Sequence, residues 1–172
     1  MIDQFSLFHL HFIEGNRNFE KNYWTKKIGT VEHNIWCGYA FETVCLHHID
    51  QIIMGLGISG AINKPCSWYY RPTDSVKNNA EIDDDLKKGA QIDLLIDRND
   101  KTISICEMKY SNGEYDIDIN YDKRIQDRLR TFQKVTKTKK TITLAFVTPN
   151  GLHDNMYSRK VRNQITADDL FK

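Results

Sequence analysis

The sequence predicts an α/β fold, with a mixed central β-sheet flanked by α-helices. Two segments, 35–56 and 118–135, carry apolar residues at helical spacing. Three β-rich runs, at 91–96, 102–110 and 141–148, lie between and after them. This alternation of helices and strands is typical of α/β domains.

Composition indicates one globular domain. The chain has 172 residues, of which 40% are hydrophobic and 27% charged. The net charge of +1 argues against tight non-specific binding of nucleic acid, but not against an enzyme that contacts the backbone locally. No apolar run is long enough to span a bilayer, and Met1–Leu10 lacks a signal-peptide pattern. The four cysteines show no CxxC spacing, so we expect reduced thiols in a cytoplasmic protein.

The first half of the chain holds the strongest helix signal. Residues 5–13 are apolar and predict a short helix or strand, followed by polar residues as far as Asn34. The pattern from Ile35 to Leu56 predicts one helix that ends at Gly55 and Gly57. Its expected apolar face contains Phe41, Cys45, Leu46, Ile49, Ile52, Ile53 and Leu56.

The second half predicts a strand hairpin, a helix and a further strand. Residues 67–70 predict a short strand, and the polar segment 71–88 predicts a mobile loop or insertion. Two strands, at 91–96 and 102–110, are joined by a tight turn at 98–101. The helix from Asp118 to Val135, the strand 141–148, a turn at 149–151 and a short strand with a final helical turn in 161–171 complete the order. The expected buried face of that helix holds Tyr121, Ile125, Leu129 and Phe132.

One carboxylate falls where an apolar residue is expected. The helical projection places Glu42 inside the apolar stripe, beside Cys45. A carboxylate facing a core is unfavourable unless it is paired, hydrogen-bonded or bound to a metal. The alternative is a structural ion pair, or a side chain that extends to the edge of the core.

Charged residues also interrupt the two strands of the hairpin. Asp93 stands among apolar residues of the first strand, and Glu107 and Lys109 share one face of the second. If the turn centres on Asp100, Asp93 lies across from Glu107. A turn with an even number of residues would instead disperse the group, unless a bulge restored it.

Such a group suits the hydrolysis of phosphodiesters. Mg²⁺ or Mn²⁺ can activate a water and neutralise developing charge, and Mg²⁺ usually takes one or two protein carboxylates. We expect Asp93 and Glu107 to hold the metal with the backbone carbonyl of Met108, and Glu42 to hold a metal-bound water or a second ion. Lys109 would orient the attacking water or stabilise the transition state.

The acid-x-lysine triplet is common, so its context decides its value. Asp85-Leu86-Lys87 is a second copy, but it lies in a polar run without a strand pattern. The alternative for Glu107-Met108-Lys109 is an ion pair at the surface.

Several blocks, in the right order, resemble one family. They are WCGYAFETVCLHHIDQIIMGLGISG (36–60), GAQIDLLID (89–97), ICEMKYS (105–111), LAFVTPNGL (144–152) and NQITADDLF (163–171). Together they resemble the C-terminal PD-(D/E)XK nuclease-like domain of a family of bacterial and archaeal ATP-binding proteins. IDQFSLFHLHFIE is similar to the segment that links the ATPase part of that family to this domain.

The resemblance implies a restriction-endonuclease-like core over residues 35–172, preceded by a linker-like segment, 1–34. It matches Glu42 to the helix acid of the family, Asp93 to the strand acid, and Glu107 and Lys109 to the E-x-K pair. It further implies a DNA substrate rather than RNA, and an ATPase partner or domain. The ATPase part is absent from the sequence, and the insertion at 71–88 is longer than is usual in the family.

Other features allow two interpretations each. Gln91, Tyr110 and Gln126 are candidates for supporting the four main residues. The aromatic run 68–70 could stack on bases, but is more typical of an edge strand that is half core. The cations of the second helix and of the segment after it either hold phosphates or form a solvated face; they are Lys123, Arg124, Arg128, Arg130, Lys134, Lys137, Lys139 and Lys140.

The sequence thus predicts a metal-dependent nuclease. The rival hypotheses are a non-catalytic nucleic-acid-binding or regulatory module, and a scaffold for docking an ATPase or forming a homo-oligomer.

Overall fold

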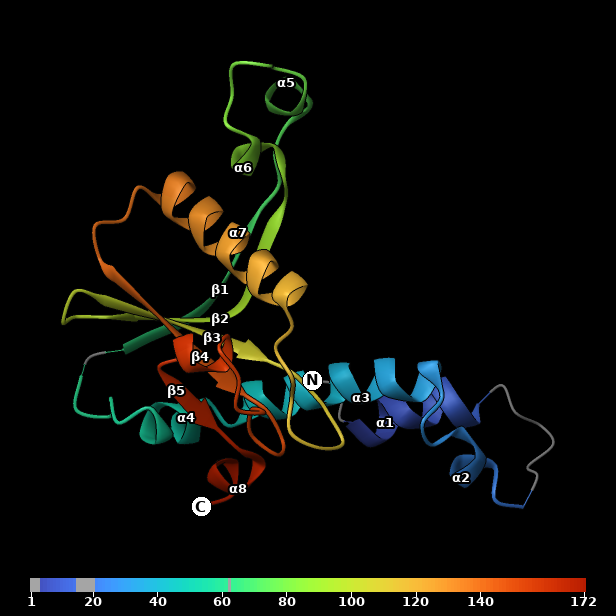
Figure 1. Cartoon of the computed structure of the whole chain (residues 1–172). Helices are drawn as coiled ribbons and strands as arrows, with labels where there is room; N and C mark the ends of the chain where they lie inside the picture. Colours follow the sequence, from blue (N-terminus) through green and yellow to red (C-terminus); the bar gives the residue numbers. More distant parts are fainter. Residues whose placement is uncertain (1–3, 15–20, 62) are drawn as a thin grey trace.

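A computed structural model describes residues 4–14, 21–61 and 63–172. The chain forms an α/β fold in which one mixed sheet lies between two layers of helices (Figure 1). The strands are β1 (Asn63–Tyr70), β2 (Ala90–Arg98), β3 (Thr102–Met108), β4 (Thr141–Val147) and β5 (Asn163–Ile165). The helices are α1 (Gln4–Phe8), π-helix η1 (His9–Ile13), α2 (Tyr23–Lys27), α3 (Val31–His47), α4 (Ile49–Gly55), α5 (Asp74–Lys77), α6 (Asp84–Lys87), α7 (Ile119–Thr136), 3₁₀-helix η2 (Ser158–Lys160) and α8 (Ala167–Leu170).

The sheet has five strands in the order β1-β2-β3-β4-β5. β1, β2 and β3 pair antiparallel, whereas β3, β4 and β5 pair parallel. The parallel step from β3 to β4 needs a crossover, and α7 provides it on one face of the sheet. The predicted hairpin and β4 are therefore confirmed, although β3 ends at Met108 rather than at residue 110. The turn at 149–151 and the final strand and helical turn are confirmed as well. The predicted strand at 67–70 is longer, because β1 begins at Asn63.

The helix predicted over 35–56 is instead two helices. α3 begins at Val31, earlier than predicted, and ends at His47, before a break at His48. The amide of His48 donates to the carbonyl of Cys45 at 3.0 Å, and its ring Nδ1 lies 2.8 Å from the Val44 carbonyl. The imidazole thus takes the place of the helical amide at Val44, which lets the chain turn and continue as α4.

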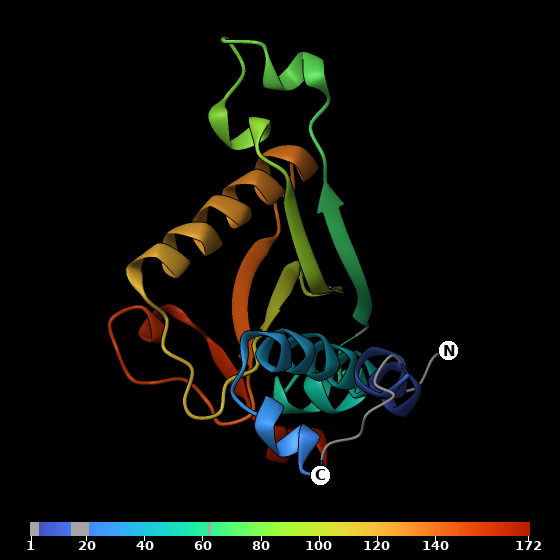
Figure 2. The ribbon, with the colours of Figure 1, turned by 90° about the vertical axis from the view of Figure 1, so that its right-hand side faces the viewer.

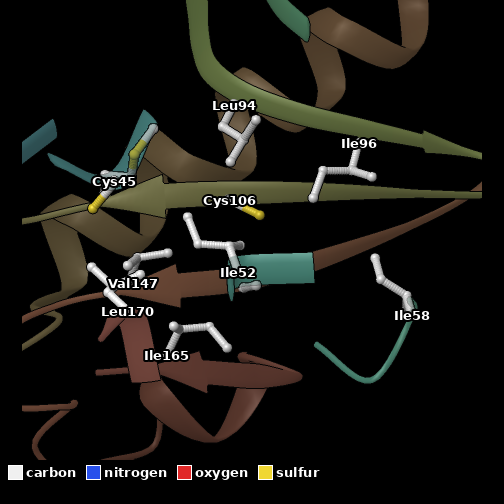
Figure 3. Close-up of a cluster of buried hydrophobic side chains, with 11 residues drawn as sticks. Cys45, Ile52, Ile58, Leu94, Ile96, Cys106, Val147, Ile165 and Leu170 are labelled. Atoms are coloured by element: carbon white, nitrogen blue, oxygen red, sulfur yellow. The ribbon is translucent and has the colours of Figure 1, made fainter. Parts of the chain in front are cut away.

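The larger core cluster packs α3, α4 and α8 onto one sheet face (Figure 3). Cys45 and Ile52 are fully buried there against Leu94 and Ile96 of β2. Leu46 is an exception to the predicted face, because it is 39% exposed at the edge of the helix. The remaining predicted members, Phe41, Ile49, Ile53 and Leu56, pack against this cluster.

On the opposite face, α7 covers the sheet along the predicted stripe. Tyr121, Ile125 and Phe132 are buried, and Leu129 packs beside them. Asp118 caps the helix, since its side chain accepts from the amide of Tyr121 at 2.7 Å.

The insertion at 71–88 has more structure than the predicted loop. It contains α5 and α6, which project beyond the sheet where β1 ends and β2 begins (Figures 1 and 2). α6 is tied to α7, because Lys134 forms ion pairs with Asp83 and with Asp85, the latter at 2.7 Å. The acids of this segment and the cations of α7 are far apart in the sequence and follow no shared spacing, so the sequence pattern could not reveal that they pair.

The described part of the N-terminal segment 1–34 is helical and packs against α3. Phe8 and Phe12 contact Trp24 and Trp36, with ring centroids 4.7–5.7 Å apart. The predicted helix-or-strand at 5–13 is thus a helix. Residues 1–3 and 15–20 of the segment predicted to be linker-like lie outside the described residues.

Candidate active site

The predicted site residues gather at the end of β3. Alternation along this strand directs Ile103 and Ile105 toward α7, and Cys106 and Met108 toward α3 and α4. Glu107 therefore faces α7. It is only 3% exposed, so its charge requires partners.

Three side chains satisfy the carboxylate of Glu107. The hydroxyl of Tyr121 donates to Oε1 at 2.7 Å, and the amine of Lys109 lies 3.3 Å from the same oxygen. Arg128 binds Oε2. Burial by itself would raise the pKa of Glu107, but Arg128 and Lys109 outweigh it and lower the pKa below its ordinary value. Glu107 is therefore held ionised, between two cations and a phenol.

Asp93 comes close to Glu107 through the hairpin register and a bulge. Leu94 pairs with Cys106, so Asp93 lies one step further, next to Glu107, in agreement with a turn centred on Asp100. From Ile92 to Leu95, two residues of β2 lie opposite a single residue of β1, which is a bulge. The side chains of Ile92 and Leu95 nevertheless both join the core cluster under α7. Asp93 thus lies in an irregularity of the kind that redirects side chains near functional sites.

Glu42 reaches the same group from α3. Burial raises its pKa, the neighbouring charges of Asp93 and Glu107 raise it further, and Lys109 lowers it. Glu42 therefore lies within electrostatic range of the other three predicted residues, although it comes from a helix and they come from β2 and the end of β3. Like charges brought together in this way are typical of functional sites, and also of ion-pair networks.

Lys109 follows the last residue of β3 but keeps the direction of the strand. Its amide donates to the carbonyl of Val147 at 2.9 Å, which extends the pairing with β4 by one residue. Its side chain is 31% exposed. It borders a cavity of about 290 Å³, together with Glu42, Met108 and Tyr110. Lys109 thus pairs with the buried Glu107 through its amine, and the same residue lines an open cavity.

The predicted supporting residues differ in their placement. Gln91 donates from Nε2 to Asp93 Oδ1 at 2.8 Å, and so fixes that carboxylate. Tyr110 lines the cavity beside Lys109, and its hydroxyl donates to Asn112 at 2.9 Å. Gln126 is half-buried on α7, two residues before Arg128, and two residues turn a helix by about 200°. It therefore points away from the side of α7 that contacts Glu107.

Two residues at the centre of the site were not predicted to belong to it. Tyr121 was expected only in the core, and Arg128 only among cations that hold phosphates or face solvent. The signal for Arg128 was present, because it stands seven residues after Tyr121 and so lies within the apolar stripe of α7. A cation in that stripe needs a buried acid, just as Glu42 in its own stripe needs a partner.

Several other cations of α7 and of the segment after it are paired. Arg130 binds Asp127 and Asp85, Lys134 binds the insertion, and Lys140 binds Asp97. Arg124 lies over the ring of Tyr121, with its guanidinium carbon 4.9 Å from the centroid. These contacts agree with a solvated, ion-paired face.

The aromatic run of β1 is half core, as the pattern favoured. Trp68 packs edge-on against Phe132 at 5.0 Å, and Tyr70 donates to the Leu86 carbonyl at 3.0 Å. Tyr69 is 78% exposed.

The cysteines Cys37, Cys45, Cys66 and Cys106 are free thiols, and burial raises the pKa of both Cys45 and Cys106 to about 12.

The residues present accommodate a hard cation only in part. Across the described ranges, no three His, Cys, Asp or Glu side chains converge as a ready set of metal ligands. Both oxygens of Glu107 are already bound, whereas Asp93 accepts from the amide of Gln91. Burial and then the acidic neighbours raise the pKa of Glu42. A pair of repelling carboxylates beside solvent fits Mg²⁺, which needs only one or two of them.

Comparisons of the chain with protein-family models, with curated proteins and with solved structures found no match. Every helix among the described residues is too short or too polar to cross a membrane.

Proposed function

We propose that the chain is a Mg²⁺- or Mn²⁺-dependent nuclease that hydrolyses phosphodiester bonds in DNA, and that its sheet is a restriction-endonuclease-like core. The observation that carries this proposal is the gathering of four side chains at the end of β3. The Lys109 amine lies 3.3 Å from Glu107, Lys109 and Glu42 line one cavity, and the hairpin register places Asp93 next to Glu107. Three acids with a neighbouring amine form the set that metal-assisted phosphodiester hydrolysis uses.

Each residue has a distinct task in this proposal. Asp93 and Glu42 would hold the cation, with Glu107 joining them if Arg128 moves aside. The bound metal would activate a water and offset the charge that develops on the phosphate. Gln91 keeps the Asp93 carboxylate in place, and Lys109 donates to a phosphate oxygen or to the attacking water. The family resemblance in the sequence further suggests an ATPase, in the same chain or a separate one, as the partner that controls access to DNA.

The chain offers a matched test of Lys109. The purified protein should cleave DNA when Mg²⁺ or Mn²⁺ is present, and Lys109→Met should reduce cleavage by about 100-fold or more, the usual loss when a transition-state donor is removed. Lys87→Met is the control, because Lys87 ends the other acid-x-lysine triplet and pairs with Asp84 at 2.9 Å on the surface. Cleavage that survives Lys109→Met, or is lost equally in Lys87→Met, would refute the proposal.

One observation favours a second candidate, a non-catalytic module that binds nucleic acid or docks an ATPase. Glu107 is fully engaged by Arg128, Lys109 and Tyr121, as expected for a structural ion pair. Calorimetric titration with Mn²⁺ separates the two candidates. Binding heat that Asp93→Asn removes supports the nuclease, and the absence of such heat supports the non-catalytic module.

A further inference from the structure

A glycine occupies the middle of α3 where nothing packs against it. Gly38 is seven residues into the helix, and a Cβ atom built there would meet nothing within 4 Å. Its φ lies outside the left-handed region, so the backbone has no need of glycine. Glycine inside a helix costs about 0.5–1 kcal/mol relative to alanine. Neither packing nor backbone geometry requires a glycine here. A need to keep the space above residue 38 open would explain why glycine is present despite its cost.

That space is the cavity beside the candidate active site. Gly38 lines it together with Tyr39, Tyr110, Glu42 and Lys109. Its volume of about 290 Å³ lies near the lower end of the range for small-molecule pockets, ~300–1,000 Å³. The cavity therefore suits a small planar ring system rather than a folded chain segment.

Aromatic and apolar side chains surround the opening. Tyr39 is 69% exposed and Ile35, one turn earlier, is 56% exposed. Tyr110 is half-buried, and its ring centroid lies 6.3 Å from that of Phe41. Exposed tyrosines of this kind are the surfaces on which unpaired bases stack, because every base presents a π-face.

The polar groups around the cavity match the rest of a nucleotide. Lys109 contributes a positive charge that suits a phosphate, and its amine is held 3.3 Å from Glu107 Oε1. Asn34 is exposed at the rim; its amide oxygen lies 3.3 Å from the ring Nδ1 of His33, and its amide nitrogen can donate to a base edge. A base within the cavity would place its phosphate near Lys109, next to the candidate metal site.

We infer that this cavity binds an unpaired nucleobase, so that the chain acts on single-stranded nucleic acid or on the frayed end of a duplex. The inference rests on the proposed nuclease function and names its substrate class. A base inside a duplex is stacked and paired on both sides, so it cannot enter unless it is first extruded. Gly38 keeps the space open, and Tyr39 supplies the stacking surface.

Binding can be tested apart from cleavage. Fluorescence anisotropy in EDTA, with a labelled oligo(dT), oligo(rU) or mixed-sequence duplex, measures affinity without hydrolysis. We expect either single strand to bind more tightly than the duplex, and the dT and rU arms show which sugar is preferred. Gly38→Leu, which fills the cavity, should weaken single-strand binding about tenfold or more, and Tyr39→Ala should weaken it roughly 5- to 150-fold, as for the loss of one stacked base.

Two variants control for folding and for general aromatic contacts. Gly38→Ala should unfold at a higher temperature than the wild type, because it removes the cost of glycine and meets no neighbour. This result would show that the position tolerates a side chain, so weak binding by a folded Gly38→Leu reports on the cavity. Tyr69→Ala removes an equally exposed tyrosine on β1, outside the cavity, and should leave affinity unchanged.

The outcomes separate this inference from the proposed function. Duplex bound as tightly as single strands, or affinity unaffected by Gly38→Leu and Tyr39→Ala, overturns the cavity assignment even if metal-dependent cleavage is found. Single-strand binding that depends on both residues, without cleavage under any divalent metal, supports the cavity and refutes the nuclease. A change in oligomeric state on Tyr39→Ala, with no change in affinity for nucleic acid, would assign this surface to a protein contact and also overturn the inference.

Discussion

Removing Arg128 should show how much the stability of the fold depends on neutralising the buried carboxylate of Glu107. Arg128→Met keeps the length and the apolar stem of the side chain but removes the guanidinium that binds Glu107. Breaking a buried ion pair by deleting one partner usually costs 3–5 kcal/mol, because the remaining charge stays buried. Here Lys109 remains 3.3 Å from the carboxylate, and the arginine side chain is 23% exposed, so we expect the lower end, about 3 kcal/mol.

The effect should depend on pH in a defined direction. In the wild type the pKa of Glu107 is lowered, so its ionised form stabilises the fold above the ordinary carboxyl pKa, and this contribution is lost as the pH falls through the lowered value. Without Arg128, burial dominates and raises the pKa of Glu107, so the charge destabilises the fold at neutral pH and protonation relieves it. The destabilisation caused by Arg128→Met should therefore shrink between about pH 7.5 and about pH 5.

Urea unfolding of the metal-free protein at both pH values measures this difference. In a separate thermal scan at neutral pH, a loss of about 3 kcal/mol should lower the melting temperature of Arg128→Met by roughly 6–12 °C. Adding Glu107→Gln to Arg128→Met should recover part of the stability, because it removes the orphaned charge. Arg124→Met, one turn earlier on α7 and exposed, is the control and should cost less than about 1 kcal/mol. A destabilisation by Arg128→Met that matches this control, or that grows on acidification, would refute the reasoning.

Three further predictions follow from single contacts. Glu42→Gln should raise the unfolding free energy in EDTA by about 0.5 kcal/mol at neutral pH, because it removes a carboxylate whose pKa is raised by burial and acidic neighbours. This gain should vanish at low pH, where Glu42 is protonated. Phe132→Ala should cost about 3–5 kcal/mol in urea unfolding and shift the fluorescence of Trp68, since the two rings pack at 5.0 Å; a cost below about 1 kcal/mol would contradict this packing. Lys134→Ala should change global stability by less than about 1 kcal/mol. It should nevertheless speed amide hydrogen exchange in residues 79–88, because the ion pairs of Lys134 with Asp83 and Asp85 hold the insertion on α7. Unchanged exchange would show that other contacts hold the insertion.

Much of the fold was predictable because it is encoded in short periods. Alternation gave the hairpin and β4, and the 3.6-residue period gave α7 with its buried face. The grouping of the candidate site residues was predictable to the same extent. Charged residues at apolar positions marked Glu42 and Asp93, and a hairpin centred on Asp100 placed Asp93 next to Glu107. These features depend on residues within about fifteen positions of one another, where sequence and geometry are directly linked.

Other features required partners that are distant in the sequence. The break at His48 arises because an imidazole competes with a backbone amide, which the apolar period through 35–56 conceals. The insertion is held by Lys134, about 50 residues further along the chain. The ionic state of Glu107 is likewise set by Arg128, 21 residues away.

The sequence by itself determined the α/β class, the main strands, the buried face of α7 and four residues of the candidate site, because each follows from local spacing. Only the tertiary structure decided which charges neutralise one another and which space stays open, namely Arg128 on Glu107 and the cavity over Gly38. The physical reason is that backbone periodicity fixes the direction of a side chain, whereas its electrostatic partner and the empty volume around it depend on how separate helices settle on the sheet.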